Sequence, residues 1–260
     1  MTLTLVLGAS GKTGRRVIDR LTDRGVAVRA GSRSGSPRFD WEDRTTWAPA
    51  LDGTGAVYIS YFPDLAAPGA AETVGAFARE AAPRKLVLLS GRGEPEAQRA
   101  EQLVREASPD ATIVRCAWFA QNFSEAFLAD QVAQGEVFFP ARDVKEPFVD
   151  VEDVADVAAA ALTEPGHDGR LYELTGPRLL TFAQAVAEIA QATGRDITYV
   201  PVSTDEFTQA MNGEPAEVVE LVTYLVTEVL DGRNERLATG VREALGREPR
   251  DFAEYAEGLR

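Results

Sequence analysis

One stretch decides the fold: Leu3-Thr4-Leu5-Val6-Leu7-Gly8-Ala9-Ser10-Gly11-Lys12-Thr13-Gly14. The apolar residues 3–7 predict a buried strand, and the amphipathic pattern at residues 15–24 predicts a helix. Between them, glycines three apart allow a tight turn, a close approach of the backbone to a pyrophosphate, and close packing of the helix on the sheet. The start of the helix adds N–H groups and a positive dipole end. We therefore predict that this turn binds a nucleotide.

The same turn contains Gly11-Lys12-Thr13, which imitates the end of a P-loop. That motif requires a glycine five positions before Gly11, where this chain has Val6. An ATPase site of the P-loop type is therefore excluded.

Short apolar runs alternate with helical patterns through the first half of the chain, as expected for a parallel sheet covered by helices on both faces. We predict an α/β fold with a doubly wound parallel Rossmann sheet, and residues 1–117 as the dinucleotide-binding core. The further strands are expected at residues 26–30, 56–60, 86–89 and 112–115, with a weak one at 45–47, and the helices at 70–81 and 95–107.

The pattern changes after residue 117, and we predict that residues 118–260 form a smaller, mainly helical substrate-binding region. Parts of 147–175 are expected to return to the core sheet. The expected elements are helices at 118–134, 151–162 and 181–192, strands at 137–139, 147–149 and 171–174, and a mainly helical stretch at 203–260 with breaks at 211–213 and 231–232.

The composition excludes several kinds of site. The 260 residues include one Cys and one His, Cys116 and His167, which are too few for a disulfide, a Cys/His zinc site or an iron–sulfur cluster. His167 lies in a turn-like run, so hydrolysis through a histidine base is not expected. We predict no metal.

The charge balance limits the kinds of binding partner that we expect. With 27 basic and 41 acidic residues, the formal net charge is −14, which disfavours binding to nucleic acid or to an anionic membrane. We see no secretion signal and no run near the roughly 18 apolar residues of a membrane span. We expect a cytoplasmic monomer or homodimer that acts on a small molecule.

The end of the second predicted strand distinguishes the two nicotinamide cofactors. An acidic residue there would bind the ribose 2′-hydroxyl and repel a 2′-phosphate, and residues 28–34 contain none. Arg33 instead lies between Ser32 and Ser34, which suits a phosphate. We therefore expect NADP(H) rather than NAD(H), with a solvated loop arginine as the alternative interpretation.

With these features, the chain resembles the NmrA-like, atypical short-chain dehydrogenase/reductase family. Within that family it is similar to the bacterial proteins that resemble ergot-alkaloid iminium reductases, and to NAD(P)H-dependent quinone reductases. The spacing of Gly8, Gly11 and Gly14 is the variant of extended and atypical members. The resemblance spans nearly the whole chain and rests on the glycine turn and on residues 88–91, 118–123, 147–157, 172–177 and 244–252.

The resemblance implies which residues contact the cofactor. Its phosphates would lie on the glycine turn, its adenosine end near the second strand, its middle beside the loop after the third strand, and its nicotinamide near the end of the fourth. Open α/β sheets bind ligands beyond the carboxyl ends of their strands, which agrees with this placement. The implied residues are Gly8, Ala9, Ser10, Gly11, Lys12, Thr13, Gly14, Ser32, Arg33, Ser60, Tyr61, Phe62, Ser90 and Gly91.

The chain lacks the acid of standard short-chain dehydrogenases, a Tyr followed four residues later by a Lys. No Tyr lies between Tyr61 and Tyr172, and none of the six tyrosines has a Lys at that position. The helix lysine of the related plant phenolic reductases is also replaced, within residues 97–101. We therefore predict reduction of an electrophile that accepts hydride when it is merely held in place: an iminium ion, a quinone or an activated enone.

The sequence offers several proton sources and three kinds of activity. Water, Ser90 or Tyr61 are candidate donors, and Asn122 is a weaker catalytic candidate. The missing pair equally suits an inactive NADP-binding redox sensor that contacts a regulator. A third alternative is an epimerase or dehydratase that uses bound cofactor internally.

Aromatic residues cluster after the sixth predicted strand, at residues 112–115, and suit a planar, polycyclic ligand. The predicted substrate-binding residues are Trp118, Phe119, Asn122, Phe123 and Phe148. For Phe123 and Phe127, which are four apart, packing in a helix core is the alternative.

The carboxylates Asp150, Glu152, Asp153 and Asp156 imitate a metal site. Capping of the helix that starts there explains them more simply.

Overall fold

The computed structural model describes residues 2–260 and divides into two compact units. Unit 1 contains the chain up to Cys116, Val151–Leu174 and Thr239–Arg247. Unit 2 contains Ala117–Asp150, Thr175–Ala238 and Glu248–Arg260.

Unit 1 is built on a six-stranded sheet in which every neighbouring pair is parallel, as predicted for a Rossmann-type α/β fold. The strand order is β2-β1-β3-β4-β5-β8. The order reverses between β1 and β3, so the loops after β1, β3 and β4 meet at one carboxyl edge, where such sheets bind ligands. The strands are β1 (Leu3–Leu7), β2 (Val28–Gly31), β3 (Thr54–Ile59), β4 (Lys85–Gly91), β5 (Thr112–Cys116) and β8 (Leu171–Leu174).

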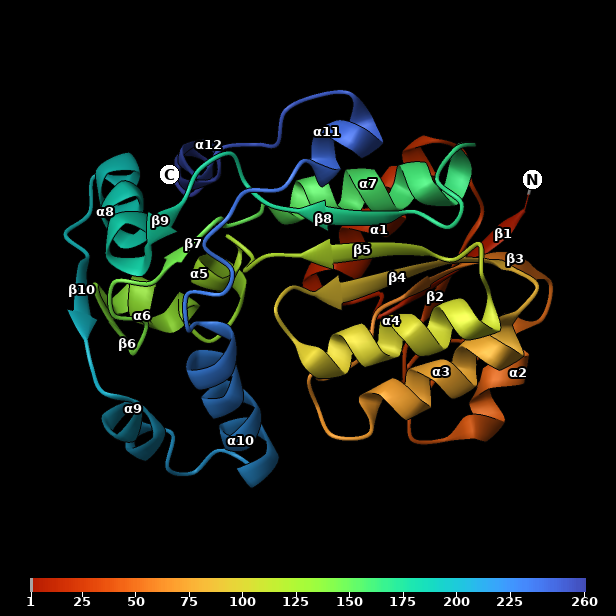
Figure 1. Ribbon diagram of the computed structural model, residues 1–260, viewed down its shortest axis with the longest axis horizontal. Coiled ribbons are helices and arrows are strands. Elements are labelled where there is room, and N and C mark those ends of the chain that lie inside the picture. Colours follow the sequence, from red (N-terminus) through yellow and green to blue (C-terminus); the bar gives the residue numbers. More distant parts are fainter. Residues whose placement is uncertain (1) are drawn as a thin grey trace. The chain divides into compact units, whose positions relative to one another are not determined.

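Helices cover both faces of this sheet (Figure 1). On one face lie α1 (Lys12–Asp23) and α7 (Val151–Thr163), and on the other lie α3 (Ala70–Ala81) and α4 (Pro95–Ala107). The alanines at 158–161 of α7 are fully or almost fully buried, because their small side chains let this helix approach the strands closely. The short helix α11 (Gly240–Leu245) packs on β8 and α7.

The predicted weak strand at 45–47 is wrong. These residues form a 3₁₀ turn, η1 (Arg44–Thr46), and the start of α2 (Trp47–Leu51). The Asp43 side chain accepts a hydrogen bond from the Thr45 N–H, which starts a helical turn instead of a strand. Trp47 is buried with its ring centroid 5.4 Å from that of Phe77, so tertiary packing overrides the β propensity of this run.

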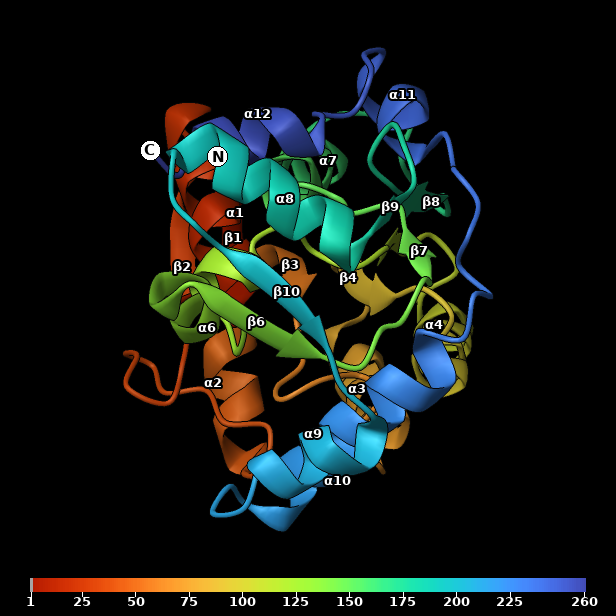
Figure 2. The same ribbon diagram turned by 90° about the vertical axis from the view of Figure 1, so that its left-hand side faces the viewer.

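Unit 2 contains small sheets and short helices around a phenylalanine-rich core. Figure 2 shows β6 and β10, which pair in parallel, and α12 beside α8. A second, antiparallel pair joins β7 and β9. The elements are α5 (Asn122–Glu125), α6 (Ala129–Gln134), β6 (Glu136–Phe139), β7 (Lys145–Glu146), β9 (Leu180–Thr181), α8 (Phe182–Thr193), β10 (Thr198–Pro201), α9 (Thr204–Ala210), α10 (Ala216–Tyr224), the π-helical turn η2 (Leu225–Val229) and α12 (Phe252–Glu257).

The single helix predicted at 118–134 is also wrong. Phe119 forms a bridge with Val149, so the segment starts in an extended conformation, and Val149 makes only this bridge instead of the strand predicted at 147–149. Ala126 is extended and separates α5 from α6. The strands β9 and β10 were not predicted, whereas the breaks at 211–213 and 231–232 follow the ends of α9 and η2 as expected.

Candidate functional site

The glycine turn has the geometry that its spacing predicts. Gly8 has φ +64°, a conformation that favours glycine, and its carbonyl accepts a hydrogen bond of 2.8 Å from the Gly11 N–H. A Cβ on Gly14 would lie 2.1 Å from the Gly8 oxygen, so only glycine lets α1 start this close to the turn. Gly8 thus allows the tight turn, Gly11 leaves room for a pyrophosphate to approach the backbone, and Gly14 lets α1 pack closely on the sheet.

The start of α1 offers donors to an anion. Its N-cap residue is Gly11, which has no side chain to bond the first amides, and no acidic residue stands in the first turn. Ser10 and Gly11 are exposed and Lys12 is half-buried. Because the orphan amides and the dipole both favour negative charge, this turn can hold a phosphate.

The loop after β2 presents a cation. The Ser32 carbonyl accepts hydrogen bonds from the N–H groups of Gly35 (3.0 Å) and Phe39 (2.9 Å), which folds the loop and leaves Arg33 exposed. The Arg33 guanidinium carbon lies 5.8 Å from the centroid of the Phe62 ring. Two residues predicted to contact the cofactor, from the loops after β2 and β3, are therefore neighbours.

The loop after β3 reaches the glycine turn. A Cβ on Gly8 would lie 3.1 Å from Ser60 Oγ, which places that hydroxyl beside the turn. Tyr61 is half-buried, its ring centroid is 5.0 Å from that of Trp41, and burial raises the pKa of its phenol. The ring of the predicted donor Tyr61 therefore packs against an aromatic residue of unit 1, Trp41.

The end of β4 is tied to a buried ion pair. Ser90 Oγ donates a 2.6 Å hydrogen bond to Glu101 Oε1, and Arg115 donates to both oxygens of Glu101, at 2.8 Å and 2.5 Å. The hydrogen bond to Glu101 raises the pKa of Arg115. In this arrangement the Ser90 proton points to a carboxylate, so Ser90 positions the end of β4 and does not present a free proton.

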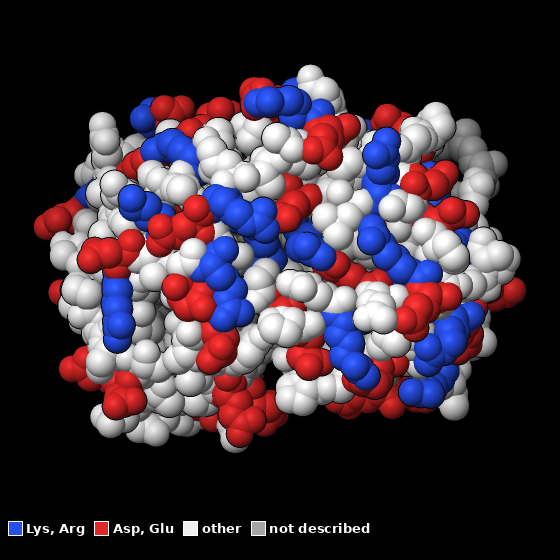
Figure 3. Space-filling view, in the orientation of Figure 1, with Lys and Arg blue, Asp and Glu red and all other residues white. Residues whose placement is uncertain are grey.

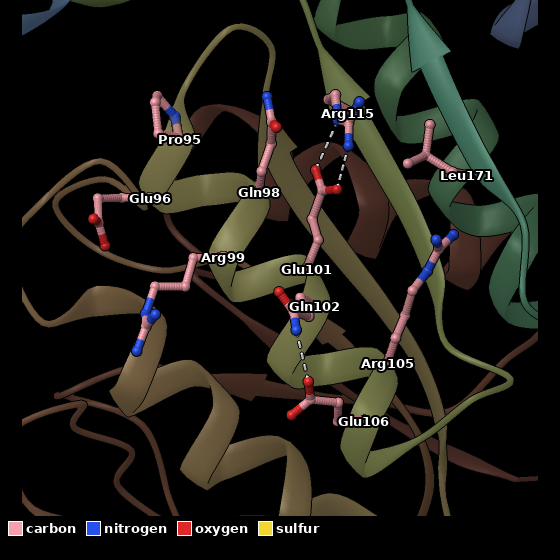
Figure 4. A pocket seen from close by; sticks show the side chains of 10 residues that line it. All are labelled: Pro95, Glu96, Gln98, Arg99, Glu101, Gln102, Arg105, Glu106, Arg115 and Leu171. Atoms are coloured by element: carbon pink, nitrogen blue, oxygen red, sulfur yellow. Dashed lines mark hydrogen bonds and ion pairs between the residues drawn. The ribbon is translucent and has the colours of Figure 1, made fainter.

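The Glu101–Arg115 pair also borders an open depression of 740 Å³ along α4 (Figure 4). In Figure 4 the two side chains point toward each other, while the side chains of Glu96 and Arg99 point away from them. No residue predicted to contact the cofactor lines this depression. It is therefore separate from the candidate cofactor site.

Two carboxyl groups at the carboxyl edge were missed by sequence reasoning: Asp64, in the loop after β3, and Glu94, in the loop after β4. Glu94 is only 8% exposed and fills the space beside Gly91, where a Cβ would lie 2.1 Å from its carboxylate. Burial, and then the facing Asp64, raise the pKa of Glu94 well above its ordinary value. Burial also raises the pKa of Asp64. Their positions after strand ends were the available signal, but Glu94 precedes Pro95 and resembles an ordinary helix cap.

The predicted substrate residues all lie in unit 2. Trp118, Phe119 and Asn122 are half-buried, and the Trp118 ring centroid is 5.8 Å from that of Phe182. Phe123 and Phe148 are 0% and 2% exposed, with ring centroids 5.6 Å apart. Both are core residues, which is the alternative that the sequence left open for Phe123, and neither presents a surface to a ligand in this conformation.

Phe127 is not a core residue, contrary to the alternative that its helical spacing suggested. It lies after the end of α5 and is 41% exposed, with its ring centroid 6.3 Å from that of Trp118. Gln121 is buried, and its Nε2 donates a 2.7 Å hydrogen bond to Asp150. Gln121 and Asp150 therefore stabilise each other.

The acidic residues of α7 pair with arginines in unit 1. Arg20 of α1 bonds both Glu152 (2.5 Å) and Asp156 (2.7 Å), and Arg247 bonds Asp153 (2.7 Å). The single histidine, His167, is 7% exposed, and its Nδ1 lies 2.8 Å from the Tyr172 hydroxyl. These contacts give the residues structural roles.

The surface mixes charges of both signs. Figure 3 shows acidic and basic side chains interspersed over the face in view. Within residues 2–260, we find no helix with the length and apolar character needed to cross a membrane.

Comparison with known proteins identifies relatives of the whole chain. The family described as NAD(P)H-binding matches residues 8–165, and the NmrA-like family matches residues 98–256. A (4-alkanoyl-5-oxo-2,5-dihydrofuran-3-yl)methyl phosphate reductase from Streptomyces griseus is 31% identical over 99% of each chain. Agroclavine dehydrogenase from Claviceps fusiformis is 30% identical over 96% of this chain and 95% of its own.

Solved structures share the fold. An NADPH-dependent quinone oxidoreductase from Escherichia coli, complexed with NADPH, has a TM-score of 0.78 at 20% identity and covers 99% of each chain. At this level of identity the similarity shows the fold alone.

Proposed function

The chain belongs to the NmrA-like family and contains its NAD(P)H-binding region, and from this premise we propose that it is an NADPH-dependent reductase of activated electrophiles. The observation that carries this proposal is the turn between β1 and α1. Gly14 packs directly on Gly8, and the exposed first turn of α1 is left without a side-chain cap. This is the geometry that a dinucleotide pyrophosphate requires.

NADP(H) is favoured over NAD(H) by the loop after β2. Residues 28–34 contain two arginines, Arg29 and Arg33. The Arg29 guanidinium donates to the carbonyls of Ala50 and Asp52, whereas Arg33 is exposed beside Ser32. Arg33 can therefore bind the 2′-phosphate through charge-assisted hydrogen bonds. The Phe62 ring beneath its guanidinium provides a flat apolar surface for the adenosine end.

The reduced substrate is an electrophile that needs little activation. The chain has no Tyr/Lys pair, the Ser90 hydroxyl is bonded to Glu101, and the Tyr61 ring packs on Trp41. The name of the Streptomyces relative describes a ring C=C with an acyl group and a lactone carbonyl on the same carbon, which is an activated enone. An iminium ion, a quinone or such an enone accepts hydride when it is held in the right orientation.

The cofactor supplies the hydride, and the residues of this chain supply binding and orientation. Gly8, Ser10, Gly11 and Lys12 hold the phosphates, and Ser60 and Gly91 bound the path toward the nicotinamide. Trp118, Phe119 and Asn122 contact the substrate, with the aromatic rings as flat apolar surfaces and the amide as a hydrogen-bonding group.

Titration with NADPH, followed by nicotinamide fluorescence, tests the binding, and NADPH consumption with a panel of quinones and iminium ions tests the reaction. Gly11→Asp is the control, because a carboxylate at the turn repels the phosphates. We expect binding and turnover in the wild type and neither in the variant. A wild-type protein that does not bind NADPH refutes the proposal.

A redox sensor without turnover is the second candidate. It is favoured by the contact of Ser90, because Glu101 accepts the hydrogen bond of that hydroxyl and this predicted donor is therefore not presented. NADPH binding without consumption across the panel would select the sensor, and steady consumption excludes it.

We also propose a cytoplasmic location and a monomeric or homodimeric state. The single cysteine is buried, as suits a protein without disulfides in a reducing compartment. Cell fractionation and light scattering after size exclusion test the two statements.

A further inference from the structure

The pair of carboxyl groups at Asp64 and Glu94 lies where the fold brings two ligand-edge loops together. β3 and β4 are hydrogen-bonded neighbours in the sheet, and each loop leaves its strand at the carboxyl end. The Glu94 carboxylate is in contact with Gly91, a residue predicted to approach the nicotinamide. A group at this position is close to the bond that the cofactor would reduce.

Glu94 is not explained by the structure of its helix. It stands at the N-cap of α4, but its side chain bonds no amide of the first turn. Its Oε2 is buried without a hydrogen-bond partner among residues 2–260. An ionised carboxylate in this state would be a buried charge with an unsatisfied acceptor, which favours protonation of the group.

The charges of neighbouring carboxyl groups also favour the protonated form of Glu94. Beyond burial, the charge of Asp64 and then that of Glu101 of α4 raise the pKa of Glu94. The charge of Lys12 lowers the pKa of Asp64. Two facing carboxyl groups cannot both ionise easily, and burial favours the neutral form of Glu94, the more buried of the two.

We propose that Glu94 is the proton donor of this reductase and that Asp64 holds the shared proton in place and returns it from solvent. The proposal rests on the proposed reductase function and supplies the acid that the missing Tyr/Lys pair leaves unassigned. For a quinone, hydride from NADPH delivers two electrons, giving NADP⁺ and a hydroquinone monoanion. The Glu94 O–H bond breaks, its proton forms an O–H bond on the anion, and solvent reprotonates the carboxylate through the half-buried Asp64.

Two probes separate this role from hydride transfer itself. Menadione needs a hydride and a proton, whereas the N-methyl dihydroisoquinolinium cation becomes a neutral amine with hydride alone. For Glu94→Gln, which keeps the size of the side chain, we expect a loss of about 10²-fold in kcat with menadione, because general acid catalysis contributes about that much. The same variant retains its rate with the iminium cation, its affinity for NADPH and its thermal unfolding midpoint. Glu96→Gln, two residues further along α4, is the matched control and keeps both rates.

The pH dependence of kcat distinguishes a proton donor from a residue with a structural role. With menadione, wild-type kcat falls as pH rises and Glu94 loses its proton, whereas Glu94→Gln shows no such fall. Asp64→Asn removes the facing negative charge and adds a donor, so the fall in kcat moves to lower pH.

The outcomes are distinct. If the wild type reduces neither probe, the reductase function fails and the donor role fails with it. If the wild type reduces both and Glu94→Gln leaves the menadione rate and its pH profile unchanged, only the donor role is refuted. Equal losses with both probes also refute it, because they assign Glu94 to hydride transfer or folding.

Discussion

Replacing the glycines of the turn one at a time separates folding from cofactor binding. In Gly14→Ala, the new methyl group would lie 2.1 Å from the Gly8 carbonyl oxygen and 2.7 Å from its carbon. Both are backbone atoms that cannot rotate away. α1 must therefore move by about 1.3 Å before the methyl group reaches the 3.4 Å at which ordinary contact begins.

The magnitudes follow from this displacement. Forcing a methyl group into a packed site costs about 1–3 kcal/mol, and the better helix propensity of alanine offsets up to about 1 kcal/mol. We expect Gly14→Ala to lower the free energy of unfolding by about 1–2 kcal/mol, and the melting temperature by about 2–8 °C. The first amides of α1 move away from the phosphates, so NADPH affinity falls by about tenfold or more, the loss of one charge-assisted hydrogen bond.

Gly11→Ala is the matched variant in the same turn. Its Cβ would meet only the Gly8 oxygen, at 3.1 Å, and its φ of −77° is ordinary for alanine. We expect stability to change by less than about 0.5 kcal/mol, whereas the exposed methyl group blocks the approach of the pyrophosphate. Chemical denaturation and NADPH titration of both variants check this. A Gly14→Ala protein as stable as the wild type, with unchanged affinity, would refute the reasoning.

Three further predictions concern other parts of unit 1. Arg33→Ala should weaken NADPH binding by about ten- to hundredfold, the value of one charge-assisted contact, and leave NADH binding unchanged; equal losses would contradict a 2′-phosphate contact. Glu101→Ala should cost about 2–3 kcal/mol in urea unfolding, because it strands a largely buried arginine, whereas Gln102→Ala on the exposed side of α4 should cost less than about 0.5 kcal/mol. Burial lowers the pKa of His167, so the unfolded chain binds the proton more readily, and stability is present above about pH 6.5 and decreases as pH falls below it. In His167→Gln this part of the pH dependence should disappear, and unfolding curves at several pH values that match the wild type would show that burial does not perturb the histidine.

The sheet and the glycine turn were predictable because their signals are local. Each central strand is a short apolar run bounded by turn residues, as in Leu3–Leu7, and the pattern does not depend on what packs on it. The turn is encoded by three positions, Gly8, Gly11 and Gly14, and the structure shows why glycine is needed at Gly8, for its positive φ, and at Gly14, for lack of space.

Other features depend on distant partners. Trp47 lies in a helix because it packs against Phe77, which is 30 residues away, and Phe119 is extended because it pairs with Val149. The short strands β9 and β10 exist only through pairing with β7 and β6. No local pattern carries this information.

The candidate site was predicted in part. The loops after β1, β2, β3 and β4 could be placed from strand order, whereas the contact between Glu94 and Gly91 could not. It depends on how the loop after β4 folds, which no local pattern encodes. The contacts of Ser90 with Glu101 and of Tyr61 with Trp41 were equally invisible, and they change which groups are available to donate a proton.

The central claim is that this protein transfers hydride from NADPH to an electrophile. The direct measurement uses NADPH deuterated at the transferable position of nicotinamide C4, the N-methyl dihydroisoquinolinium cation and mass spectrometry of the product. We predict one deuterium in the amine, formed in step with NADP⁺. Bound NADPH with no deuterium in the product of any electrophile tested would contradict the claim and leave a cofactor-binding protein without turnover.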